Sequence, residues 1–158
     1  MDENMSKSLN RVQAALIAAG IEPRILEMAG STRTAVEAAD QAGCELDQIV
    51  KSLIFQGPNG LALFLTAGGR QVDPARASAL AGQKLDRADP NTVREVTGFA
   101  IGGVSPLGHL TALPVWADRR LADFSVIWAA AGTPRHIFQV EPPALIRAAG
   151  AEWAEFCA

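Results

Sequence analysis

The segment Ile49–Gly68, IVKSLIFQGPNGLALFLTAG, decides the fold of this chain. Two apolar runs flank the turn sequence Gly57–Gly60, and this arrangement predicts a β-hairpin with a slightly long loop. Because side chains alternate between the two faces of a strand, Lys51 is expected on the same face as Leu53 and Phe55. The first strand of the hairpin therefore carries a lysine among residues that belong to the core.

Helices and strands are predicted on both sides of the hairpin, from apolar periodicity and from capping residues. Thr34 followed by Glu37 is a capping box, and Asp73–Pro74 and Asp89–Pro90 each join an N-cap residue to a proline at the first helical position. Besides the hairpin, the sequence predicts helices over 8–20, 34–43, 73–82, 89–98, a short segment from 118, and 142–150, and strands over 23–28, 99–101, 113–118, 124–132 and 136–140.

This order of elements is neither a strict strand–helix alternation nor an all-β pattern. It predicts an α/β (α+β) fold with one mixed sheet. The 158 residues suit a single domain, 1–158, with a core of its own. With 49% hydrophobic and 20% charged residues, the composition is that of a globular chain and not of a disordered one.

Location and partners are bounded by the same composition. No apolar run approaches the roughly 18 residues that a membrane helix needs, and the acidic, polar N-terminus has no signal-peptide core behind it. Cys44 and Cys157 lie far apart, so a disulfide framework is not expected. We therefore expect a soluble, cytoplasmic protein. Its formal net charge of −3, with scattered basic residues, argues against a protein that grips long duplex nucleic acid and leaves contact with a short single-stranded end open.

The stretch FAIGGVSPLGH, Phe99–His109, contains adjacent glycines, which cost backbone entropy on folding. One interpretation is an ordinary strand-to-loop turn. The other is a loop whose backbone N–H groups, from Gly102 to Ser105, approach a ligand closely and polarise a carbonyl group. In that case Pro106 would stiffen the loop so that the donors are already in place.

Lys51 also has two interpretations: a stem packed in the strand with the ammonium reaching water, or an ammonium at a pocket mouth fixed against an anionic or carbonyl oxygen. The two histidines, His109 and His136, flank loops where a polar side chain could face a pocket. Cys44, Cys157 and these histidines lack the spacing of a metal site, so no metal and no cofactor is expected. Neither a Gly-x-Ser-x-Gly motif nor a P-loop is present, and covalent catalysis is not supported.

Four segments together resemble the YbaK family of aminoacyl-tRNA deacylases, which includes the editing domain of bacterial prolyl-tRNA synthetase. They are TAVEAADQAG, IVKSLIF, REVTGFAIGGVSPLGH and WAAAGTPRHIFQVEPPALI. The resemblance implies a barrel-like mixed sheet surrounded by helices. It also implies hydrolysis of the ester that joins a wrong amino acid to the 3′ end of a tRNA, with tRNA-Pro as the expected tRNA and prolyl-tRNA synthetase as a candidate partner.

The resemblance also assigns residues. It implies that Lys51 corresponds to the family lysine, and that Ser52, beside it, lies where members of differing specificity differ. His136 is the candidate for a polar residue late in the chain, and Thr34 is a candidate contact as well as a helix cap. The implied glycine loop consists of Gly102, Gly103, Val104, Ser105 and Pro106, of which the two glycines would act with the lysine in the chemistry.

An activated ester needs positioning and oxyanion stabilisation more than a strong nucleophile. We therefore expect the glycine-loop amides to orient the ester carbonyl, Lys51 to hold a phosphate or the acyl oxygen, and the ribose 2′-hydroxyl to activate water. The acidic net charge predicts weak affinity for tRNA unless a synthetase helps. Two alternatives stay open: a non-catalytic module that binds aminoacyl-tRNA ends or a synthetase, and a small-molecule or nucleotide-binding protein.

Overall fold

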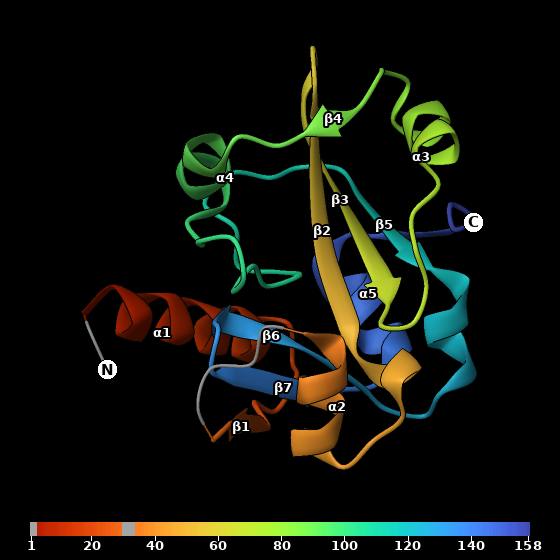
Figure 1. Cartoon of the computed structure of the whole chain (residues 1–158). Coiled ribbons are helices and arrows are strands. Elements are labelled where there is room, and N and C mark those ends of the chain that lie inside the picture. Colours follow the sequence, from red (N-terminus) through yellow and green to blue (C-terminus); the bar gives the residue numbers. More distant parts are fainter. Residues whose placement is uncertain (1–2, 30–33) are drawn as a thin grey trace.

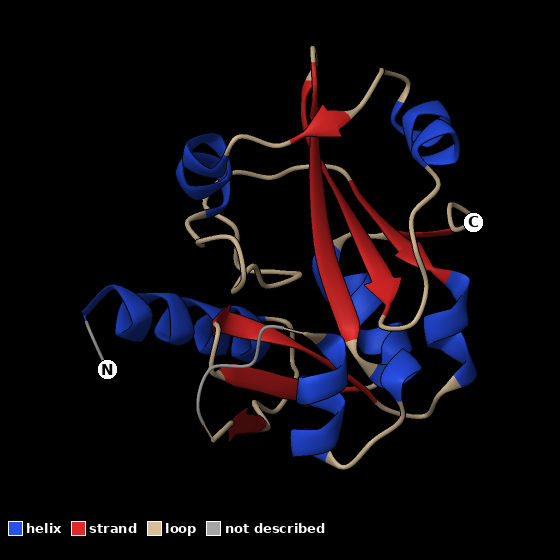
Figure 2. Ribbon diagram, viewed as in Figure 1, coloured by secondary structure: helices blue, strands red, loops and turns tan. Residues whose placement is uncertain are grey.

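The structure is a computed structural model that describes residues 3–29 and 34–158. Two sheets form its framework (Figures 1 and 2). A five-stranded mixed sheet has the order β4-β2-β3-β5-β8, and a three-stranded antiparallel sheet has the order β1-β7-β6. An isolated bridge between Ile49 and Trp128 joins them at one point. The prediction of an α+β fold with a mixed sheet and helices around it is confirmed, but the sheet is not closed into a barrel.

Helices and strands follow each other in an irregular order along the chain. Its helices are α1 (Glu3–Ala18), α2 (Ala35–Ala42), α3 (Pro74–Ala81), α4 (Pro90–Thr97) and α5 (Pro142–Ala149), with short 3₁₀ turns η1 (Leu46–Gln48) and η2 (Arg119–Asp123). Its strands are β1 (Ile25–Glu27), β2 (Val50–Gly57), β3 (Gly60–Ala67), β4 (Asp86–Arg87), β5 (Val115–Asp118), β6 (Ile127–Thr133), β7 (His136–Val140) and β8 (Glu152–Ala154).

The hairpin of β2 and β3 has the predicted strands but a tighter turn than expected. Gly57 pairs directly with Gly60, so only Pro58 and Asn59 form the loop. The predicted face is also confirmed: Lys51, Leu53 and Phe55 pair with Thr66, Phe64 and Ala62, and Phe64 packs edge-on against Phe55 and Phe156. The opposite face of the hairpin packs on the main core, which lies between the two sheets.

Predicted capping residues start and end the helices. Oγ1 of Thr34 accepts a hydrogen bond from the N–H of Glu37, and a carboxylate oxygen of Asp89 accepts one from the N–H of Thr92. Asp73 does the same for α3, and glycines in the left-handed conformation follow α2 to α5. These boundaries follow the sequence because a cap is a contact between residues only a few positions apart.

The prediction of a strand over 99–101 is wrong. Phe99 is fully buried, but residues 98–114 form a loop after α4, without strand pairing. α1 lies along β6, and the loop after α4 descends toward it (Figure 1). No helix among residues 3–29 and 34–158 is long and apolar enough to cross a membrane.

Candidate active site

Part of the outer edge of β2 has no neighbouring strand. β3 pairs along the whole length of β2, whereas β4 pairs only with Phe55 and Gln56. The bridge at Ile49 closes the other end. Between these points, the edge around Ser52 is open.

Ser52 presents its polar groups at this open edge. The N–H of Leu63 donates to the carbonyl of Pro114, on the β5 side of β3. The backbone N–H and C=O groups of β3 that point toward β2 are therefore those of Ala62, Phe64 and Thr66. Because these groups alternate along a strand, the N–H and C=O of Ser52 point away from β3. Its Oγ is buried and has no hydrogen-bond partner among the described residues. Such an unpaired buried hydroxyl is costly, which marks a place where a ligand can bind.

The glycine loop faces this edge with free N–H groups. The N–H of Gly103 donates to the carbonyl of Ala100 (3.0 Å) and closes a four-residue turn. Gly102 has φ +99° at the third position, as a type II turn requires. Within the described part of the chain, the N–H groups of Gly102 and Val104 have no acceptor. These two groups, and not that of Gly103, are available to polarise a carbonyl.

The edge and the loop line a cavity of about 320 Å³, which we call the loop cavity. It brings together six of the residues singled out in the sequence: Thr34, Lys51, Ser52, Gly102, Val104 and His136. Its remaining wall comes mostly from apolar residues of α2, β6, β7 and the position after β1, among them Ala38, Trp128, Ile137 and Met28. The cavity is thus a small, largely apolar site with a few polar groups, as small-molecule sites usually are.

Gly103, Ser105 and Pro106 lie behind this lining. A Cβ on Gly103 would come within 3.0 Å of the backbone of Thr133, so the glycine lets the loop pack directly on β6. Oγ of Ser105 accepts a hydrogen bond from the N–H of Leu107 (3.3 Å). All three are buried, so they support the loop from inside.

Arg11 and His109 fasten the two ends of the loop. From α1, Nε of Arg11 donates to the carbonyl of Gly108 (2.9 Å) and Nη2 to that of Gly98 (2.7 Å), and its guanidinium lies 4.4 Å from the ring centroid of Phe99. Nε2 of His109 lies 2.7 Å from the carbonyl oxygen of Ser105, which makes it the donor. Burial lowers the pKa of His109, and the nearby Arg11 lowers it further, although the hydrogen bond opposes both. The neutral imidazole of His109 therefore holds the loop through this hydrogen bond.

Lys51 lines the loop cavity, but its ammonium is already bound. Nζ donates to the carbonyl oxygen of Arg70, 2.6 Å away, beyond the end of β3. Arg70 in turn pairs with the buried Asp118 (3.3 Å). The ammonium has three N–H donors, and its hydrogen bond to Arg70 uses one of them.

His136 is buried at the wall of the cavity, with 6% of its surface exposed. Its Nδ1 lies 2.7 Å from Oγ1 of Thr133, which also accepts the N–H of Arg135 (3.1 Å). The arrangement satisfies both side chains when the hydroxyl of Thr133 donates to Nδ1, which leaves the proton of a neutral ring on Nε2. His136 is therefore a fixed wall of the cavity.

The hydroxyl of Thr34 is committed to α2, since it accepts the N–H of Glu37 and lies 3.2 Å from the Glu37 carboxylate. Among the described residues, no group of three or more histidine, cysteine, aspartate or glutamate side chains could hold a metal ion. Sequence reasoning missed the parts played by Arg11 and Thr133. Arg11 belongs to no quoted segment, and only the folded chain brings it to the loop. Thr133 stands three residues before His136 in a quoted segment, but its hydrogen bond to the imidazole is seen only in the structure.

Comparisons with known proteins find similarity over most of the chain. Residues 29–148 match the family described as the aminoacyl-tRNA editing domain. A solved protein described as a candidate trans-editing enzyme for prolyl-tRNA synthetase superposes with a TM-score of 0.91 at 46% identity, over 96% of this chain and 97% of that one. The Bacillus subtilis protein YwhH, described as uncharacterized, is 30% identical over 138 residues, which are 86% of this chain and 88% of that protein.

A similarity to a much longer protein is also found. The proline–tRNA ligase of Thermosipho melanesiensis is 36% identical over 90 residues, which are 56% of this chain and 16% of the ligase. This chain therefore resembles one segment of the ligase.

Proposed function

The chain belongs to the aminoacyl-tRNA editing domain family, and we propose that it hydrolyses the ester of a mischarged tRNA, with tRNA-Pro carrying a small wrong amino acid as the substrate. One observation carries this proposal: Ser52, at the open edge, lines the same cavity as Gly102 and Val104, whose N–H groups have no acceptor among the described residues. The similarity to a candidate trans-editing enzyme supports it.

In the proposed reaction, the N–H groups of Gly102 and Val104 donate to the carbonyl oxygen of the ester. Water, held by the neighbouring ribose 2′-hydroxyl, attacks the carbonyl carbon, and the two amides stabilise the negative charge that develops on the oxygen. The bond between the carbonyl carbon and the ribose 3′-oxygen then breaks. That oxygen takes one proton of the water, and the amino acid leaves as a carboxylate once its second proton passes to the solvent. No residue of the chain becomes covalently bound.

The amino acid side chain occupies the inner part of the loop cavity, against Thr133 and His136. The cavity, with a volume of about 320 Å³, has room for a small side chain together with the ester. A second site of this kind serves a physical need, since one methylene group changes the binding free energy in a synthetase pocket by only ~1–3 kcal/mol. Size and the fixed imidazole of His136 are the features by which the site selects what it removes.

Lys51 has a proposed role in the same step. Its flexible stem allows the ammonium to leave the carbonyl of Arg70 and to bind the acyl oxygen or the terminal phosphate of the tRNA. If Lys51 only tied β2 to the segment after β3, its removal would change stability and leave turnover intact.

The test is deacylation of tRNA-Pro charged separately with alanine, cysteine, serine or proline, by the native protein and by Lys51→Ala. The proposal expects rapid loss of one small amino acid, sparing of proline, and loss of turnover in a variant whose circular dichroism is unchanged. No hydrolysis above the spontaneous rate would favour a module that binds aminoacyl ends without cleaving them. Addition of prolyl-tRNA synthetase tests whether that enzyme is a partner that raises the affinity for tRNA.

A further inference from the structure

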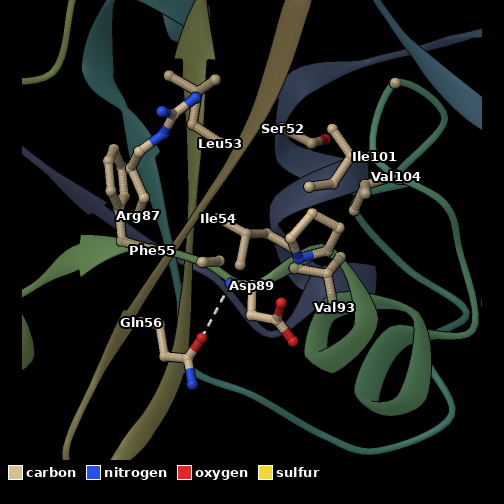
Figure 3. A pocket seen from close by; sticks show the side chains of 13 residues that line it. Ser52, Leu53, Ile54, Phe55, Gln56, Arg87, Asp89, Val93, Ile101 and Val104 are labelled. Carbon is tan, nitrogen blue, oxygen red and sulfur yellow. Dashed lines mark hydrogen bonds between the residues drawn. The ribbon is translucent and has the colours of Figure 1, made fainter.

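The glycine loop lines two separate sets of cavities. One consists of the loop cavity and its continuation along the open edge of β2, where Figure 3 shows Ser52, Ile101 and Val104. The other is a cavity of about 530 Å³ lined by the loop, α1 and the end of α4, which we call the basic cavity. Of the described residues that line it, only Pro134 also lines the loop cavity. The basic cavity is therefore a neighbour of the candidate site and not a part of it.

Two glycines bring the walls of the basic cavity together. Gly132 of β6 has φ +95°, and a Cβ there would lie 2.8 Å from the carbonyl oxygen of Ser8, so α1 packs directly on the strand. Gly103, against the backbone of Thr133, does the same for the loop. The cavity is thus a fixed feature of the fold, and its volume is within the range of ~300–1,000 Å³ typical of ligand sites.

Three cations from two helices line this cavity. Lys7 and Arg11 are four positions apart, which places them on one face of α1, and Arg94 comes from the last turn of α4. The described lining residues include no aspartate or glutamate. Arg94 is exposed, and its guanidinium makes no hydrogen bond or ion pair with the described residues. In a chain with a net charge of −3, such a local concentration of positive charge attracts an anion.

Arg11 adds a second, independent reason to expect an anion. Burial lowers the pKa of Arg11, and none of the described carboxylates pairs with its guanidinium. Two of its five N–H donors bind the carbonyl oxygens of Gly98 and Gly108, which leaves three. An anion in the basic cavity would accept hydrogen bonds from these donors and compensate the partly buried charge.

We propose that the basic cavity binds phosphodiester groups of the RNA that carries the ester, through Lys7, Arg11 and Arg94. The inference rests on the proposed function and states how the same substrate is held away from the reacting carbonyl. A guanidinium suits this ligand because its planar fork can donate two parallel hydrogen bonds to a phosphate. Pro134, which both cavities share, marks the place where the RNA passes from one cavity to the other.

This contact supplies affinity for RNA that the acidic chain otherwise lacks. Contacts to phosphates read no base sequence, so the basic cavity positions the RNA while the loop cavity selects the amino acid. Because Arg11 holds both the loop and the phosphate, the RNA is positioned relative to the N–H groups of Gly102 and Val104.

The test is the binding of an uncharged RNA hairpin, built from the acceptor stem of tRNA-Pro and its single-stranded 3′ end, followed by fluorescence anisotropy over a range of salt concentrations. Each phosphate contact adds about 0.7–0.9 to the slope of log K against log salt. Lys7→Gln and Arg94→Gln should each remove about this amount. Since the affinities converge near ~1 M salt, binding at ~0.1 M should weaken about five- to eightfold. Arg147→Gln is the matched control, since it removes one exposed arginine of α5 that lines neither cavity.

A second measurement separates phosphate binding from an effect on the chemistry. Aminoacyl-adenosine carries the ester but no phosphodiester group, so Arg94→Gln should hydrolyse it at the native rate. With the charged hairpin, the same variant should raise KM about five- to eightfold and leave kcat close to the native value.

Three results would overturn the inference. Equal weakening of RNA binding by Arg94→Gln and Arg147→Gln would show a general attraction of charge. Competition by inorganic phosphate as strong as that by unlabelled hairpin would reduce the cavity to a general anion site. Loss of activity on aminoacyl-adenosine in Arg94→Gln would show that the arginine acts through the loop. If the native protein hydrolysed neither substrate, the proposed function would fail, and the anisotropy data would still judge the RNA contact.

Discussion

Arg11→Met should detach the glycine loop from α1 and destabilise the fold. Hydrogen bonds that involve a charged group each contribute about 1.5–3 kcal/mol, and Arg11 makes two, to the carbonyls of Gly98 and Gly108. The cost of partly burying the guanidinium, which lowers its pKa, offsets part of this gain. Methionine keeps the packing of the stem, so the expected loss is about 2–3 kcal/mol.

Urea unfolding followed by circular dichroism measures this loss. With a slope of about 2 kcal/mol per molar urea, the midpoint should fall by about 1–1.5 M. Arg11→Lys keeps the charge but not the fork geometry, so its midpoint should lie between those of the native protein and Arg11→Met. Arg147→Met removes an exposed arginine that has no hydrogen bond or ion pair with the described residues, and it should shift the midpoint hardly at all. If Arg11→Met behaved like Arg147→Met, the hydrogen bonds of Arg11 would contribute nothing to stability, and the turn at Gly102 would hold the loop by itself.

Three further results are expected. Gly102→Ala and Gly150→Ala both place a Cβ in open space at positive φ (+99° and +65°), so each should lower the free energy of unfolding by about 1–2 kcal/mol. Only Gly102→Ala should also lower kcat/KM, by tenfold or more. Equal activities of the two variants would show that the turn at Gly102 has no part in the mechanism. Because the pKa of His109 is lower in the folded protein than in the unfolded chain, whose value is about 6.5, the unfolded chain takes up the proton first, and stability should fall as the pH drops below ~6.5. His109→Gln should flatten this dependence in urea midpoints, and an unchanged slope would contradict the assignment. Burial raises the pKa of Cys157 to about 11, so a thiol reagent near neutral pH should label the half-exposed Cys44 and reach Cys157 only on unfolding. Rapid double labelling would contradict the burial of the segment after β8 that holds Cys157.

Local contacts made much of the fold predictable. The hairpin, the four capped helices and the strand faces depend on residues within a few positions of each other, so their patterns are visible in the sequence. The prediction of a strand over 99–101 is wrong because a short apolar run does not distinguish a strand from a buried loop. Phe99 is buried by tertiary packing under Arg11, a residue 88 positions earlier in the chain, and periodicity carries no trace of that contact.

The sequence indicates several residues of the candidate site but not the hydrogen bonds that they make. Lys51, Ser52, Gly102 and His136 do line one cavity. That the lysine holds the carbonyl of Arg70, and that Gly103 uses its N–H to close a turn, depends on distances that no spacing rule contains. The open edge at Ser52 likewise depends on the shortness of β4, a strand that no pattern in the sequence indicates.

The open edge of β2 also bears on how this protein avoids sticking to itself. An unpaired strand edge offers N–H and C=O groups to any extended chain, and long flat edges are templates for aggregation. Here the bridge at Ile49 and the pairing with β4 at Phe55 stop the gap at both ends, and the glycine loop stands across it. The open stretch of β2 is therefore short, and residues of the glycine loop line the cavity beside it. The protein can therefore keep reactive backbone groups unsatisfied in every copy without joining those copies together.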